Sequence, residues 1–137
     1  MAKPAEKKNK KLIVGLVDTV TIRGKKGIVK KKALFDTGAT RTSIDMAIAA
    51  KAGIGPIIKV VNVKAASNPD GMKRRIVAQA TLVIKGKKIK TGVSIEDRRG
   101  LPYPILIGRD IIHNNFIIDV SRTHKGPRTA DIRAAFA

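Results

Sequence analysis

Residues 33–44 read Ala-Leu-Phe-Asp-Thr-Gly-Ala-Thr-Arg-Thr-Ser-Ile and decide the fold of this chain. Apolar residues lead up to Asp36, and the following Thr37 and Gly38 are typical of a tight turn. Glycine lets the backbone approach neighbouring groups closely, while the threonine hydroxyl can hydrogen-bond locally and hold the loop. The stretch therefore predicts one carboxylate presented at the end of an apolar strand.

A second apolar stretch stands later in the chain, where residues 103–110 read Tyr-Pro-Ile-Leu-Ile-Gly-Arg-Asp. It predicts a short strand that ends at Gly108 and Arg109, followed by a short helix. Tyr103 lies between two prolines, and we expect it to pack beneath a loop.

The composition favours one small β-rich domain. The chain has 137 residues, of which 43% are hydrophobic and 3% aromatic, so Ile, Val, Leu and Ala must build the interior. Apolar runs and alternations predict strands at 12–23, 28–35, 57–66, 75–84, 89–95, 102–107 and 116–120. A short helix is expected over 46–50, capped by Ser43 or Asp45 and ended by Gly53. The turn signal at 67–71 makes 57–84 a long hairpin.

The formal net charge is +19 and there is no cysteine. Such a charge attracts polyanions, so nucleic acid is a candidate partner, and the absence of cysteine is compatible with a reducing compartment. Residues 1–11 are predicted to be a disordered basic tail, 12–121 the folded domain and 122–137 a C-terminal extension. No signal peptide or membrane-spanning segment is predicted, so we expect a cytoplasmic protein without a membrane partner.

The two motifs together resemble the halves of a retropepsin-like aspartic protease subunit. The resemblance spans about Leu12 to Val120 and is closest to a prokaryotic subfamily labelled ATP-dependent zinc proteases. It implies an acid-protease β barrel with one or two short helices, in which the 57–84 hairpin takes the place of the flap. Since Asp-Thr-Gly occurs once, two copies of Asp36 would have to meet across a homodimer.

The resemblance also assigns residues. Asp36, Thr37 and Gly38 would form the catalytic turn of an aspartic endopeptidase, with Thr37 bonding across the dimer. The terminal strands would form the interface between subunits. Residues expected to bind a peptide substrate are Ala39, Thr40, Arg41, Arg74 and Arg109.

The chain departs from the viral pattern after the catalytic turn. Viral relatives often have an acidic residue at the position of Thr40, where it pairs with the arginine that corresponds to Arg109. We expect that ion pair to be missing, with Asp110 or Asp45 as a substitute partner for one of the arginines. Asp97 is expected to pair with Arg98 or Arg109.

Arginines around the opening would favour an acidic substrate. Arg41 is one of them. Further basic residues stand beside the hairpin turn (Lys73, Arg74, Arg75) and before the second motif (Arg98, Arg99). The subfamily is also associated with the ligase that adds glutamate tails to a ribosomal protein. The resemblance therefore implies a role in trimming such tails.

No cofactor or metal is expected, despite the subfamily's label. The sequence has no glycine loop ending in Lys-Ser or Lys-Thr and no His-Glu-x-x-His, and its two histidines, His113 and His124, do not have zinc-site spacing. Two alternatives to a protease stay open: a non-catalytic dimer that captures acidic peptides, and an RNA- or ribosome-binding protein. The scarcity of aromatic residues argues against a base-stacking platform.

Overall fold

The computed structural model describes residues 10–64 and 71–123. This part of the chain is mainly β, as predicted. The strands are β1 (Leu12–Gly15), β2 (Val17–Gly24), β3 (Gly27–Phe35), β4 (Ser43–Asp45), β5 (Ile57–Lys64), β6 (Met72–Ile84), β7 (Lys87–Glu96), β8 (Ile105–Ile107) and β9 (Phe116–Asp119). Two short helices accompany them, α2 (Met46–Ala52) and α3 (Arg109–Ile112).

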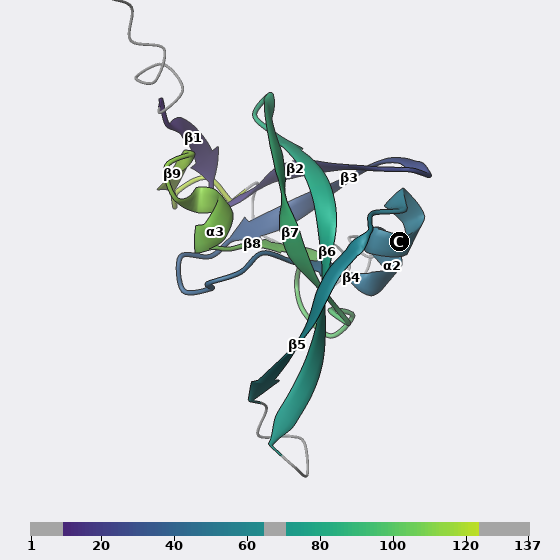
Figure 1. Ribbon diagram of the computed structural model, residues 1–137. Helices are drawn as coiled ribbons and strands as arrows, with labels where there is room; N and C mark the ends of the chain where they lie inside the picture. The colour runs from purple at the N-terminus through teal and green to yellow at the C-terminus, as the bar shows by residue number, and fades with distance from the viewer. Residues whose placement is uncertain (1–9, 65–70, 124–137) are drawn as a thin grey trace, which may run out of the picture.

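Six of the strands close into a barrel (Figure 1). Their order is β2-β3-β8-β4-β7-β6, and β6 returns to pair with β2, so the ring has no free edge. Closure satisfies the backbone hydrogen bonds that an open sheet would leave at its margins. β5 pairs with β6 alone and extends the sheet outside the ring. The predicted acid-protease barrel is confirmed.

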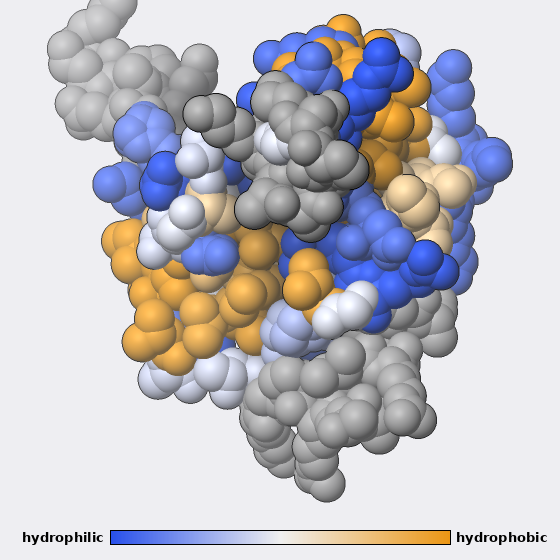
Figure 2. Space-filling model, turned by 90° about the horizontal axis from the view of Figure 1, so that it is seen from below, coloured by the Kyte–Doolittle hydropathy of each residue, from blue (hydrophilic) through white to orange (hydrophobic). Residues whose placement is uncertain are grey.

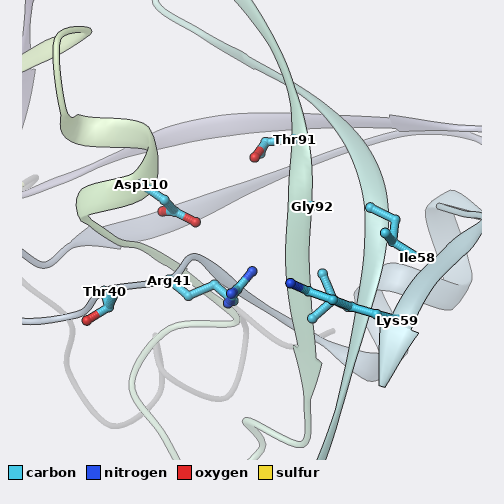
Figure 3. A pocket seen from close by; sticks show the side chains of 8 residues that line it. Thr40, Arg41, Ile58, Lys59, Thr91, Gly92 and Asp110 are labelled. Carbon is cyan, nitrogen blue, oxygen red and sulfur yellow. The ribbon is translucent and has the colours of Figure 1, made fainter. Parts of the chain in front are cut away.

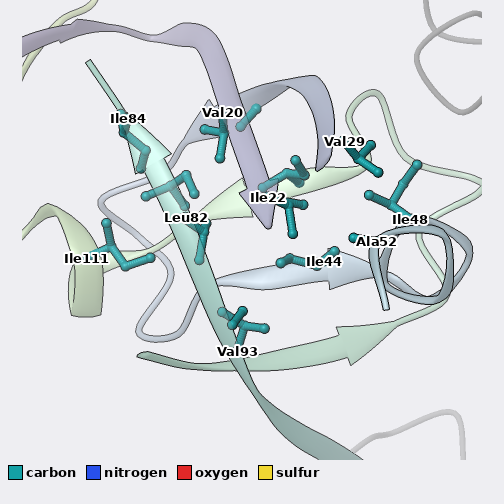
Figure 4. Close-up of a cluster of buried hydrophobic side chains, with 14 of the residues drawn as sticks. Val20, Ile22, Val29, Ile44, Ile48, Ala52, Leu82, Ile84, Val93 and Ile111 are labelled. Atoms are coloured by element: carbon teal, nitrogen blue, oxygen red, sulfur yellow. The ribbon is translucent and has the colours of Figure 1, made fainter. Parts of the chain in front are cut away.

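Aliphatic side chains fill the barrel (Figure 4). Strands β2 and β6 alternate, so that Val20, Ile22, Leu82 and Ile84 are buried while the residues between them face outward. Two of the three phenylalanines lie at the end of the core near β9, where the rings of Phe35 and Phe116 meet edge to face at 6.0 Å. The interior is therefore built largely from branched aliphatic residues, as the composition predicted.

The first predicted strand, 12–23, is wrong as a single element. The chain breaks at Leu16, and β1 leaves the barrel to pair in parallel with β9. Two features explain the break. The Gly15 amide donates to the Asp18 carboxylate. The Gly15 backbone also packs closely against Arg122, so that a Cβ at Gly15 would lie 2.6 Å from the Arg122 carbonyl oxygen. An apolar run gives no sign of such a bend.

The predicted helix is present and is two residues longer at its C-terminus. The carboxylate of Asp45 caps it by accepting from the Ala47 amide, whereas Ser43 belongs to β4 and donates to Glu96. Gly53 ends the helix in the left-handed conformation (φ 72°) that L side chains rarely adopt. Of the two candidate caps, Asp45 is thus the right one.

The predicted hairpin is formed by β5 and β6, which project from the barrel in Figure 1. β6 begins at Met72, three residues before its predicted start. The predicted turn at 67–71 lies almost wholly outside the described residues, as do most of the basic tail and of the C-terminal extension. No helix in the described ranges is long and apolar enough to cross a membrane.

Candidate active site

Asp36 lies where the two sequence motifs meet. β3 and β8 run in parallel, with Phe35 opposite Ile107, and the Asp36 amide donates to the Ile107 carbonyl at 2.8 Å. One oxygen of its carboxylate, Oδ1, accepts from the Gly38 amide at 2.8 Å. Within residues 10–64 and 71–123, Oδ2 has no hydrogen-bond partner. The turn thus orients one carboxylate oxygen and leaves the other available, on a half-exposed side chain.

Two glycines of this site allow close packing, and at Gly108 the backbone approach requires one. A Cβ on Gly38 would lie 3.1 Å from the Asp36 Oδ1. On Gly108, a Cβ would lie 2.9 Å from the Ala39 carbonyl oxygen and 2.8 Å from the Arg41 carbonyl carbon. Gly108 is therefore where the end of β8 and the loop after Asp36 pass each other, and any side chain there would push them apart.

Hydrogen bonds between Thr42 and Asp110 connect the turn to α3. The Asp110 carboxylate accepts from the Thr42 amide at 3.0 Å and from the Thr42 hydroxyl at 2.8 Å, and that hydroxyl accepts from the Gly108 amide at 3.1 Å. The Arg109 amide adds a bond of 2.8 Å to the Ala39 carbonyl. Sequence analysis missed the role of Thr42, since nothing in the motif distinguishes its hydroxyl from the neighbouring threonines.

Arg109 binds neutral acceptors where the viral pattern has an ion pair. Its guanidinium donates to the Thr37 carbonyl and to the Thr40 hydroxyl, both at 2.9 Å. Thr40 therefore occupies the position of the missing acid and still contacts the arginine. Among the described residues, neither proposed substitute binds an arginine side chain: Asp110 binds Thr42, and Asp45 accepts from the Ala47 and Arg98 backbone amides.

Arg41 lines a depression of about 360 Å³ beside the turn (Figure 3). The turn contributes Thr40 and Arg41, and α3 contributes Asp110. The facing strands contribute Ile58, Lys59, Val77, Thr91 and Gly92. The predicted binding residue Arg74 is not among the lining residues. It lies exposed on β6, opposite Asn62 of β5.

Other arginines predicted near the opening have partners within the fold. Arg75 pairs with Glu96 at 3.1 Å, and the Arg98 side chain donates to the Tyr103 carbonyl at 3.0 Å. Burial lowers the pKa of Arg98, while the nearby carboxylates of Glu96, Asp45 and Asp36 act in the opposite sense. Tyr103 is buried, as expected.

Asp97 pairs with neither predicted partner. It binds Arg99 at 2.8 Å, and hydrogen bonds from that arginine's side chain and backbone lower the Asp97 pKa to about 2. Both side chains are exposed, so the pair serves to shape the loop rather than the site.

An apolar hollow of about 440 Å³ lies on the other side of the turn. Thr37 is its polar member, and the others come from β9, α3 and the start of the barrel: Leu16, Phe35, Ile112, Phe116, Ile117, Ile118 and Val120. Figure 2 shows hydrophobic residues gathered in one patch on the side where β1, β9 and α3 lie in Figure 1. Ile13, Ile117 and Val120 are at least half exposed.

Within the described ranges, no three histidine, cysteine, aspartate or glutamate side chains are grouped so that they could hold a metal ion. His113 is exposed at the end of α3, and His124 lies outside the described residues.

A six-stranded barrel with an Asp-Thr-Gly turn and a projecting hairpin defines the retropepsin-like class, and comparison with solved structures agrees. The EIAV protease complexed with an inhibitor superposes with a TM-score of 0.55 and 22% identity, over 72% of this chain and 85% of that one. A Legionella pneumophila protein of unknown function superposes with a TM-score of 0.54 and 19% identity, over 82% and 96%. No curated protein matches the sequence.

The chain belongs to the RimB-like family, described as retropepsin-like aspartic endopeptidase RimB, whose model matches residues 49–129. The match covers the hairpin, β7, the Gly108-Arg109 motif and β9. It begins after the Asp-Thr-Gly turn and does not include Asp36.

Proposed function

We propose that the protein is an aspartic endopeptidase that works as a homodimer, with Asp36 of each subunit activating water. The observation that carries this proposal is the state of the Asp36 carboxylate. One oxygen is held by the Gly38 amide at 2.8 Å, while Oδ2 is without a hydrogen-bond partner in the described part of the chain. Membership of a retropepsin-like family supports the same reading.

A second subunit supplies what a single chain lacks. Hydrolysis by aspartates needs two carboxylates that share one proton, and one protomer contributes one Asp-Thr-Gly. A two-fold dimer in which the apolar hollows of the two subunits face each other would bring the two Thr37 residues together, since Thr37 lines the hollow. The two Asp36 residues would meet at the same place, because each directly precedes Thr37. Burial of Ile13 and Ile117 would favour the association.

The chemistry follows from the shared proton. The ionised Asp36 takes a proton from water, the resulting hydroxide adds to the peptide carbonyl, and the protonated Asp36 of the other subunit gives its proton to the carbonyl oxygen. Collapse of the tetrahedral intermediate then breaks the C–N bond: the first Asp36 gives the proton that it took from water to the amine, and the Asp36 of the other subunit takes a proton back from a hydroxyl of the intermediate as the new carboxylic acid forms. The pair thus returns to its starting state, with one proton between two carboxylates.

The test compares the wild type with Asp36→Asn on a library of peptides, with products identified by mass spectrometry. We expect cleavage by the wild type and none by the variant, because an amide cannot act as a general base. Asp97→Asn is the matched control, since Asp97 is exposed and bonded to Arg99, and it should cleave like the wild type. Equal cleavage by Asp36→Asn and wild type would refute the proposal.

A further inference from the structure

We propose that one outer face of the barrel binds the phosphate backbone of a nucleic-acid duplex, a function separate from the peptidase activity. The face is formed by β3, β2, β6 and β7, which follow one another in the ring (Figure 1). It carries cations that lie far apart in the sequence and that the fold gathers on one surface. We call this surface the basic face, and its exposed cations are Arg23, Lys30, Lys32, Lys88 and Lys90.

The strand register places these side chains together. Residues directly opposite each other in antiparallel strands lie on the same side of a sheet. One row across the face is Lys30, Thr21, Val83 and Lys88, and the next row is Ile28, Arg23, Thr81 and Lys90. Their neighbours along the strands, such as Ile22, Val29 and Leu82, are buried in the barrel. Because successive residues of a strand point to opposite sides, both rows face outward.

The fold does not neutralise the basic face. Its four strands contain two acids, Asp18 and Glu96. Asp18 is buried and accepts from the Gly15 amide, while Glu96 ends β7 and pairs with Arg75 at 3.1 Å. Among the described residues, no carboxylate forms an ion pair with a cation of the basic face. Like charges on one surface repel each other unless an anion lies against them, so the face favours a polyanion as its ligand.

The spacing of the cations fits a duplex. Lys30 and Lys88 are separated by three strand pairings, which corresponds to about 14 Å along the sheet. The two backbones on either side of a B-form major groove are about 12 Å apart, and the minor groove of an RNA duplex is also wide. Arg23 and the hydroxyls of Thr21 and Thr81 lie between the two lysine columns, and such groups donate to phosphate and sugar oxygens. The basic face can therefore contact both backbones of one duplex.

The residue types on the basic face distinguish a duplex from other polyanions. Proteins that lie on a membrane surface insert apolar side chains into it, and Ile28 is the one large exposed apolar residue of this face. Proteins that bind single strands stack bases on aromatic rings, and no residue of the basic face is aromatic. Lysine, arginine and threonine without such rings match contacts to a duplex backbone.

Fluorescence anisotropy with a fluorescein-labelled duplex tests the basic face. The duplex has about 20 base pairs, or two helical turns, and is made both as RNA and as DNA. Lys30→Gln combined with Lys88→Gln should weaken binding about tenfold at physiological salt. It should also reduce the slope of log affinity against log salt by about 2, since two phosphate contacts are lost. The lysines of residues 1–11 are present in every variant, so their effect cancels in the comparison.

A matched variant separates the basic face from the general charge of the protein. Lys51→Gln combined with Lys73→Gln removes the same charge from α2 and from the β5–β6 hairpin, at two exposed lysines outside the face. It should leave the affinity within about twofold of the wild type and the salt slope nearly unchanged. Tighter binding of RNA than of DNA would identify RNA as the ligand, and equal binding would show that the face recognises phosphate alone.

Three outcomes would overturn the inference. The first is a wild type that does not bind either duplex, and the second is equal loss of affinity in the two double variants. The third is a Lys30→Gln, Lys88→Gln protein that keeps its affinity for the duplex but no longer sediments with vesicles containing phosphatidylserine, because the face would then be a membrane surface. Peptide cleavage is measured alongside, and we expect this double variant to cleave like the wild type and Asp36→Asn to bind the duplex like the wild type. The basic face and the proposed peptidase activity can thus be tested separately.

Discussion

At the scale of single residues, hydrogen bonds hold the Asp-Thr-Gly turn, and no ion pair does so within the described part of the chain. Arg109 donates to Thr37 and Thr40, and the Asp110 carboxylate accepts from Thr42. These bonds join α3 to both sides of the turn, so that the direction of Asp36 depends on contacts made by its neighbours. The fully buried Thr42 is the centre of this arrangement.

Replacing Thr42 by valine should therefore destabilise the protein by about 1 to 3 kcal/mol. Valine has nearly the same shape, but it leaves the Gly108 amide without its acceptor and Asp110 with one donor fewer. Urea unfolding of the two proteins measures the difference. Thr42→Ser, which keeps the hydroxyl, is the control and should lose much less. Equal stability of wild type and Thr42→Val would show that these bonds contribute little.

At the scale of elements, Asp18 joins three parts of the fold. Its carboxylate accepts from the Gly15 amide at the end of β1 and from the Thr19 amide in β2, and it pairs with Lys85 between β6 and β7 at 3.2 Å. Burial alone would raise the pKa of Asp18, but these hydrogen bonds and the lysine outweigh it and hold the pKa below its usual value. The bend between β1 and β2 thus depends on an ionised side chain.

Asp18→Asn should accordingly lower the free energy of unfolding at pH 7 by about 1 to 3 kcal/mol. Because the folded-state pKa is the lower one, the contribution of Asp18 is complete above its unfolded value of about 3.9. It is then lost as the pH falls through the folded value. Denaturant unfolding at pH 7 and near pH 3 measures both effects. Asp119→Asn is the control, since its pKa is lowered by Ser121 at an exposed site. A gap between Asp18→Asn and wild type that does not narrow in acid would contradict this account.

Sequence analysis identified the elements whose side chains alternate and missed those defined by distant contacts. β6 was predicted because apolar and polar residues alternate over 75–84. β4 was missed because its three residues, Ser43–Asp45, are too few to show a period. The β1 break was missed because part of its cause is the Arg122 carbonyl, which is far along the sequence. The Asp-Thr-Gly turn was evident, whereas the placement of Lys59 in the depression beside Arg41 depends on how β5 pairs with β6.

At the scale of the whole molecule, the apolar hollow beside Thr37 is the surface on which the proposed dimer depends. Ile117→Lys places a charge on this surface at a residue that is 55% exposed, and it should shift the protein toward monomer. Sedimentation velocity over a range of concentrations measures the shift. If the active species is the dimer, the cleavage rate should fall as the fraction of monomer rises, and it should fall further on dilution.

Ile28→Lys is the matched control for this experiment. Ile28 is 62% exposed on β3 and does not line the hollow, so the same substitution there should leave both association and cleavage unchanged. A monomer that cleaves as fast as the wild type would contradict the two-fold arrangement, as would a wild type that stays monomeric while it is active.

The burial of Tyr103 has a practical consequence for spectroscopy. The chain has one tyrosine and no tryptophan, so its intrinsic fluorescence comes from a single ring. That ring belongs to Tyr103, whose backbone carbonyl accepts a hydrogen bond from the Arg98 side chain. Any change in that emission when a ligand is added would report on this one loop, without a label and without interference from the rest of the protein.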